Sequence, residues 1–154
     1  MKIFFLCRTG YHTSLVAASM FLESLSGGSC RRGNPTGLKG YGRLPGKEIG
    51  KPFFVGTGKG HIDVYTIGVS RENALLAKAA GELAGLISSG AGDFQIVDTT
   101  PAMSKWTCFG FRLKRIGLEG PAEFFCSLGM KREIPGLRKL LDEKTKTVTG
   151  KKRA

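Results

Sequence analysis

The first 25 residues constrain the fold most, because they show the pattern of a buried strand, a short polar loop and an apolar helix. Residues 3–6 (IFFL) are a continuous apolar run, which is typical of a strand buried on both faces. Residues 15–25 are apolar nearly all round a helix, which favours packing against a sheet. Thr13 or Ser14 is expected to cap this helix. Such an opening predicts an α/β protein.

Strands and helices continue to alternate along the rest of the chain. The expected strands are residues 53–55, 63–67, 94–97 and 124–127, and the expected helices are residues 71–87, 101–116 and 135–143. This order predicts a three-layer α/β sandwich, in which helices cover both faces of a mostly parallel sheet of about four to five strands. Residues 53–67 could add an antiparallel hairpin.

The length of 154 residues and a hydrophobic content of 41% suit one domain, which we expect over residues 1–143. Residues 26–52 are expected to form a long basic loop rich in Gly and Pro, and residues 144–154 a basic disordered tail. No apolar run approaches the roughly 18 residues that a membrane span needs, and the first apolar run is too short for a secretory signal. We therefore expect a cytoplasmic protein that does not insert into a membrane.

The chain is strongly basic, with 24 Lys or Arg against 12 Asp or Glu and a formal net charge of +12. Residues 102–154 carry 13 of these basic residues against five acidic ones. Such a charge attracts polyanions. The sequence shows no helix-turn-helix, zinc-finger or RNA-recognition signature. A non-enzymatic binding module for nucleic acid or for an acidic protein partner is therefore one of two functions that we consider.

The loop between the first strand and the first helix suggests the other function. Ligands of open α/β sheets bind beyond the carboxyl ends of the strands, where a helix N-terminus offers free N–H groups and a positive dipole. A phosphate or a phosphorylated ligand is the expected partner of this loop. The expected anion-binding residues are Arg8, Thr9, Gly10, Tyr11, His12, Thr13 and Ser14.

Three residues are candidates for catalysis: Cys7, His12 and Asp98. The field at the helix N-terminus favours a nucleophilic thiolate at Cys7, although a Cys at the end of a buried strand also serves as a small hydrophobic residue. His12 could act as a general acid, stabilise a thiolate, or bond to local backbone. Asp98 could be a base at the same sheet edge, or could cap the following helix. With only two His and four scattered Cys, we expect no metal and no cofactor.

The loop resembles the phosphocysteine loop of the sugar phosphotransferase IIB proteins of the lactose and cellobiose type. Their pattern Cys-x-x-Gly-x-x-Thr-Ser-Leu is matched by Cys7, Gly10, Thr13, Ser14 and Leu15, and the resemblance covers about the first 20 residues. It implies a Cys-dependent phosphoryl transfer or a phosphatase-like activity. The Cys-x5-Arg loop of low-molecular-weight tyrosine phosphatases is not met, because Thr13 stands where Arg is required.

Over residues 1 to about 143 the chain resembles a small uncharacterised α/β family of spore-forming bacteria, a domain of unknown function. The family's opening Cys-x-Gly-Gly-x-His-Ser-Ser resembles residues 7–14, and His12 is among the residues kept. The family patterns Val-Tyr-x-Leu-Gly and Val-Asp-Thr-x-Pro resemble residues 64–68 and 97–101. The resemblance implies the α/β fold and supplies no activity.

Overall fold

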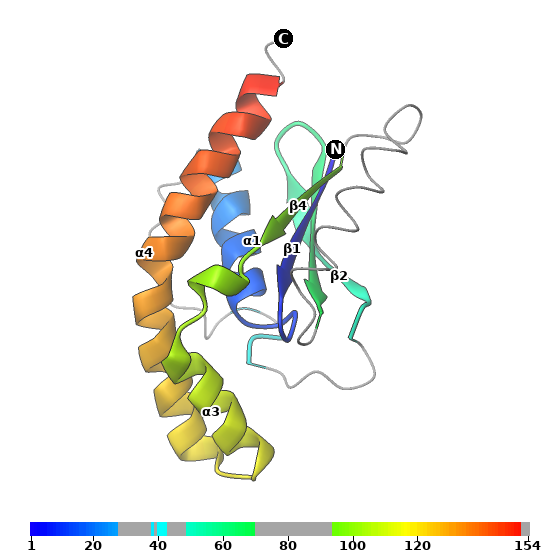
Figure 1. The fold of residues 1–154 in the computed structure, drawn as a ribbon. Coiled ribbons are helices and arrows are strands. Elements are labelled where there is room, and N and C mark those ends of the chain that lie inside the picture. The colour runs from blue at the N-terminus through cyan, green and yellow to red at the C-terminus, as the bar shows by residue number, and fades with distance from the viewer. Residues whose placement is uncertain (28–37, 39, 43–48, 70–93, 152–154) are drawn as a thin grey trace. The chain divides into compact units, whose positions relative to one another are not determined.

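The computed structural model describes residues 1–27, 38, 40–42, 49–69 and 94–151, with side chains described up to residue 144 (Figure 1). The chain divides into two compact units, Met1–Pro101 and Ala102–Ala154. The expected helix at residues 71–87 and most of the loop at residues 26–52 lie outside the described residues. The single domain expected over residues 1–143 stays a prediction.

Within the described residues, the first unit holds a four-stranded sheet of strand order β2-β3-β1-β4. The strands are β1 (Lys2–Cys7), β2 (Pro52–Gly58), β3 (Ile62–Gly68) and β4 (Phe94–Asp98). β1 is parallel to both β3 and β4, whereas β2 is antiparallel to β3. The expected hairpin is thus confirmed, but the expectation of a mostly parallel sheet is wrong. The sheet is mixed, because the hairpin contributes an edge strand of the sheet itself.

One face of this sheet packs against helix α1 (Thr13–Leu25). Ile3 and Phe5 of β1 are buried, and the ring of Phe5 lies 5.7 Å from the ring of Phe21 on α1. Successive strand residues point to opposite faces, so Phe4 lies on the other face, where its ring stacks on Tyr65 of β3. The apolar residues of β1 therefore contact partners on both sides, as the run at residues 3–6 predicts.

Two buried threonines in this unit differ in their hydrogen bonding. Thr66 and Thr99 are both fully buried. The Thr99 hydroxyl donates to the carbonyl oxygen of Leu6 at 2.7 Å, whereas the Thr66 hydroxyl has no hydrogen-bond partner among the described residues. A buried polar group without a partner loses its hydration and gains nothing in return.

We therefore expect opposite effects from one substitution at these two sites. Thr66→Val is expected to raise the free energy of unfolding by about 1 to 3 kcal/mol, because it removes a desolvated hydroxyl. Thr99→Val is expected to lower it by about 1 kcal/mol, because it removes a hydrogen bond. Urea denaturation of both variants measures the difference. If both substitutions change the free energy of unfolding in the same direction, the difference in hydrogen bonding between the Thr66 and Thr99 hydroxyls is wrong.

As far as the structure describes it, the second unit consists of two helices that run side by side, α3 (Lys105–Arg115) and α4 (Glu119–Lys151) (Figure 1). A 3-10 turn, η2 (Thr100–Ala102), precedes them, so the helix expected from residue 101 begins instead at Lys105. Ser104 caps α3, and its hydroxyl accepts a hydrogen bond from the backbone N–H of Trp106 at 3.3 Å.

Two expectations in this unit are wrong. Residues 124–127 (FFCS) are not a strand but part of α4, and α4 begins well before Pro135 and passes through it. A run of four apolar residues does not by itself distinguish a strand from a buried helical segment. α4 ends at Lys151, and the basic disordered tail expected over residues 144–154 stays a prediction.

α3 and α4 approach closely because glycines face each other's helices. A Cβ on Gly110 would lie 2.6 Å from the Cys126 sulfur, and a Cβ on Gly129 would lie 2.7 Å from the Thr107 nitrogen. The buried carboxylate of Glu133 accepts hydrogen bonds from the Ser104 N–H at 2.8 Å and from the Thr107 hydroxyl.

No helix in the described part of the chain has a stretch long and apolar enough to cross a bilayer.

Candidate functional site

The thiol of Cys7 lies at the carboxyl end of β1 and is surrounded by the loop that follows. Its sulfur accepts a hydrogen bond from the Gly10 N–H at 3.1 Å and lies 3.0 Å from the Ser14 hydroxyl. The Thr9 hydroxyl is a further 3.7 Å contact. We call residues 7–14 the cysteine loop. Its sulfur is the point on which a backbone donor and two hydroxyls converge, and Cys7 is only 1% exposed.

Gly10 fixes the shape of the cysteine loop. Its φ of +77° lies in the left-handed region that favours glycine. A Cβ at this position would lie 2.6 Å from the backbone nitrogen of Gly68, at the end of β3. In turn, a Cβ on Gly68 would lie 2.7 Å from the carbonyl oxygen of Thr9. Two glycines therefore allow the loop to touch the backbone of the neighbouring strand.

The start of α1 differs from the expectation that Thr13 or Ser14 caps it. His12 is the N-cap residue and makes no side-chain cap hydrogen bond, so the expected cap is wrong. Thr13 and Ser14 are instead the first two helical residues, and both are fully buried. The physical reason is that the Ser14 hydroxyl is directed to the Cys7 sulfur, which places the helix N-terminus beside the thiol.

His12 is fully buried and is paired with Tyr41, a residue that sequence reasoning missed. The Tyr41 hydroxyl and His12 Nε2 share a hydrogen bond of 2.9 Å, and their rings stack with centroids 4.9 Å apart. The other ring nitrogen, Nδ1, lies 3.4 Å from the Thr13 hydroxyl. The only sequence signal for Tyr41 is an aromatic residue between two glycines, Gly40 and Gly42, within the long basic loop.

Residues 40–42, which we call the cover segment, pack on the cysteine loop. The Gly42 N–H donates to the carbonyl oxygen of Tyr11 at 2.9 Å. A Cβ on Gly40 would already lie 3.5 Å from the Tyr11 ring. The ring of Tyr11 is in turn held edge-on by Phe53 of β2, at 5.6 Å. The cover segment therefore contacts both His12 and Tyr11.

Asp98 lies at the same sheet edge as Cys7, because β1 and β4 are parallel. Its register partner is Leu6, so its side chain leaves the sheet on the face opposite to that of Cys7. Its carboxylate accepts a hydrogen bond from the Thr100 N–H at 2.9 Å and so caps the turn η2. Asp98 thus caps the 3-10 turn and not the helix that follows, which Ser104 caps, and a catalytic role for Asp98 stays a prediction. Arg8 is the exposed residue of the cysteine loop.

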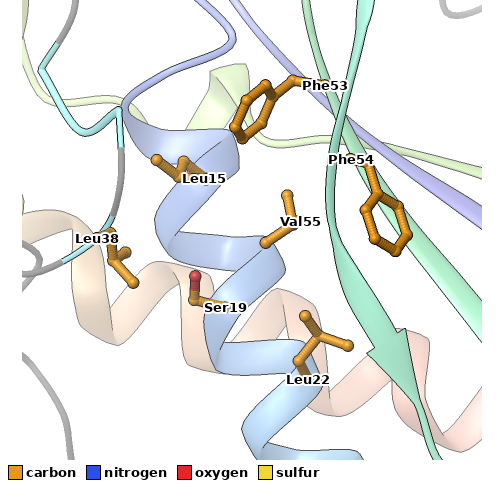
Figure 2. Close-up of a pocket in the computed structure, with 7 residues that line it drawn as sticks. All are labelled: Leu15, Ser19, Leu22, Leu38, Phe53, Phe54 and Val55. Atoms are coloured by element: carbon orange, nitrogen blue, oxygen red, sulfur yellow. The ribbon is translucent and has the colours of Figure 1, made fainter.

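A separate apolar groove of about 300 Å³ lies between α1 and β2. Figure 2 shows side chains of α1 facing those of the edge strand. The lining residues are Leu15, Ser19, Leu22, Leu38, Phe53, Phe54 and Val55. None of the residues expected to bind an anion lines this groove, and its polarity does not suit a phosphate.

The described residues do not bring together three or more His, Cys, Asp or Glu side chains that could hold a metal ion. Cys108 and Cys126 are half-buried cysteines of the second unit that form no disulfide. Burial raises the pKa of the Cys126 thiol, with a smaller opposing effect from Lys114. A raised pKa lowers the thiolate fraction at neutral pH, so Cys126 is expected to react slowly with alkylating agents.

Comparisons of the chain with known proteins identify its family and give no activity. No curated protein and no solved structure matches the chain. One family model, described as "Protein of unknown function (DUF3189)", matches residues 2–146 and so includes the cysteine loop and the four strands that the structure describes. This match confirms the resemblance to an uncharacterised family. The chain therefore belongs to the DUF3189 family of proteins of unknown function.

Proposed function

We propose that the cysteine loop binds phosphate groups in the cytoplasm and that Cys7 is the nucleophile of a phosphoryl transfer. One observation supports this proposal most directly. The Cys7 sulfur accepts a hydrogen bond from the Gly10 N–H and lies within hydrogen-bond distance of the Ser14 hydroxyl, beside the N-terminus of α1. Donors directed at sulfur stabilise the thiolate, and a helix N-terminus adds a favourable field.

In the proposed step, the thiolate sulfur attacks the phosphorus atom of a phosphate monoester. The S–P bond forms while the bond between phosphorus and the leaving oxygen breaks, and the leaving alkoxide takes a proton. His12 is the proposed proton donor, because it carries the imidazole of the cysteine loop, with Nδ1 beside the Thr13 hydroxyl and Nε2 hydrogen-bonded to Tyr41. Hydrolysis of the phosphocysteine, or transfer to a second acceptor, would restore the thiol.

Charge and sequence pattern support phosphate as the ligand. A net charge of +12 attracts anionic substrates. The resemblance of Cys7, Gly10, Thr13 and Ser14 to a phosphocysteine loop points to the same chemistry. The step needs no role for Asp98, whose carboxylate accepts the hydrogen bond of the Thr100 N–H, and the catalytic role expected for Asp98 stays a prediction.

The experiment is hydrolysis of p-nitrophenyl phosphate by the full chain, followed as release of p-nitrophenol. Cys7→Ser is expected to reduce turnover to background, because a serine hydroxyl is not activated by the donors that stabilise a thiolate. Cys108→Ser is the matched control and is expected to turn over at the wild-type rate. A Cys7→Ser variant as active as the wild type would exclude Cys7 as the nucleophile.

A further inference from the structure

Four aromatic side chains form a contiguous surface on the second unit, which we call the aromatic face: Trp106, Phe109, Phe124 and Phe125. The rings of Trp106 and Phe125 are nearly parallel, with an interplanar angle of 2°, and Phe109 and Phe124 meet Phe125 edge-on. Trp106 is 38%, Phe109 46% and Phe124 66% exposed. Exposed aromatic clusters of this kind mark interaction sites on soluble domains.

Basic residues lie on the same helix faces as these rings. Lys131 and Arg132 follow Phe124 and Phe125 by seven residues, which is nearly two helical turns, so each lies above the corresponding ring. The guanidinium of Arg132 lies 5.6 Å from the centre of the Trp106 ring. Arg112 follows Phe109 by one turn on α3. All of these basic side chains are exposed.

The charge of the second unit favours an anionic partner. Residues 102–154 carry 13 Lys or Arg against five acidic residues, and one of those five, Glu133, is buried and hydrogen-bonded within the unit. A second copy of the chain would place two strongly positive surfaces together, which is unfavourable. The partner must offer negative charge and flat apolar surfaces together.

We propose that the aromatic face binds single-stranded nucleic acid. Bases stack on exposed aromatic rings, and phosphates pair with the basic side chains beside them. A membrane-surface helix instead separates its apolar face from its charged face. Here aromatic and basic residues share one face, which fits a ligand whose bases and phosphates alternate. This site is independent of the phosphoryl transfer proposed for Cys7.

Trp106 is the only tryptophan of the chain, so its fluorescence reports on the aromatic face directly. Addition of an unlabelled 20-nucleotide oligothymidine to the full chain is expected to quench this fluorescence, because a base stacks on the indole. Raising the salt concentration from 50 to 200 mM is expected to weaken binding by about 50-fold if about four phosphates are contacted. Cys7→Ser is expected to bind like the wild type.

The matched variants are Phe124→Ala and Ile116→Ala, measured by anisotropy of a fluorescein-labelled oligothymidine. Phe124→Ala is expected to weaken binding by roughly 5- to 150-fold, the range for loss of one base stack. Ile116 is an exposed aliphatic residue, 70% accessible, which offers no ring for stacking, so Ile116→Ala is expected to change binding less than about twofold. Both positions are exposed, and circular dichroism checks that both variants keep their helices.

Two outcomes would overturn the proposal. If the oligonucleotide binds without quenching Trp106 and Phe124→Ala binds as tightly as the wild type, charge alone carries the binding. If the oligonucleotide does not bind, while phosphatidylserine vesicles bind and both Phe124→Ala and Ile116→Ala weaken that binding, the aromatic face is a membrane contact.

Discussion

The Gly10→Ala variant is expected to lose about 2 to 5 kcal/mol of its free energy of unfolding. Two costs add at this position. A non-glycine residue held at a φ of +77° costs about 1 to 2 kcal/mol. The new Cβ would also lie 2.6 Å from the backbone nitrogen of Gly68, and forcing such a contact costs about 1 to 3 kcal/mol. Backbone atoms cannot swing aside as the end of a side chain can, so the cysteine loop would have to shift.

Gly27→Ala separates the two costs. Gly27 has nearly the same φ, +76°, but a Cβ there would meet nothing within 4 Å. This control is expected to lose only the backbone cost of about 1 to 2 kcal/mol. Urea denaturation of both variants gives the comparison. Equal losses at the two positions would show that the contact between Gly10 and Gly68 does not hold the loop.

Removal of the Tyr41 side chain is expected to accelerate alkylation of Cys7 by roughly 10- to 100-fold. Cys7 is buried, so a reagent reaches it only when the surrounding chain opens, and we expect the cover segment, which packs on His12 and Tyr11 of the cysteine loop, to limit this opening. Tyr41→Ala removes the hydrogen bond to His12, worth about 1 kcal/mol, and the ring stacking, worth about 0.5 to 1.5 kcal/mol. The free energy of opening then falls by the sum of these two contributions. Each 1.4 kcal/mol of that decrease raises the alkylation rate about tenfold.

A graded series tests this explanation. Tyr41→Phe keeps the stacked ring and removes only the hydroxyl, so its acceleration is expected to be about fivefold, equivalent to roughly 1 kcal/mol. The readout is the rate of iodoacetamide modification of the peptide that contains Cys7, by mass spectrometry. Cys108 in the same molecule serves as the internal reference and is expected to keep its rate. An unchanged rate at Cys7 in Tyr41→Ala would mean that Tyr41 does not control access.

Much of the first unit was predictable because its signals are local. The apolar run at residues 3–6, the polar loop after it and the apolar helix beyond need only neighbouring residues to be recognised. The glycine-rich hairpin turn between β2 and β3 is equally local. The mixed character of the sheet was missed although the hairpin itself was expected, because the sequence does not show that β3 pairs with the distant strand β1 and so brings the hairpin into the sheet.

The second unit shows the opposite case. Residues 124–127 form a strand-like apolar run, yet they lie in a helix because their neighbours along α4 pack against α3. The helix geometry depends on close contacts at Gly110 and Gly129, which no periodicity reveals.

The residues of the cysteine loop were predictable from the sequence, whereas the residues that pack on the loop were not. Cys7, Gly10 and Ser14 lie within eight residues of one another, so a single motif identified them. Tyr41 is 29 positions from His12, and their contact depends on how the chain returns to the loop. For Asp98 the sequence correctly placed the residue at the sheet edge, but the register with Leu6 determines the face on which its side chain lies.

The most direct test of the account is the rate of Cys7 alkylation by iodoacetamide at pH 7 in phosphate, compared with chloride at the same ionic strength. If the cysteine loop binds phosphate, phosphate slows alkylation of Cys7 in a saturable manner and leaves Cys108 unaffected. Modification of the Cys7 peptide is absent in Cys7→Ser, which checks the assignment. Equal Cys7 rates in phosphate and in chloride, up to the highest phosphate concentration, would contradict an anion site at this loop.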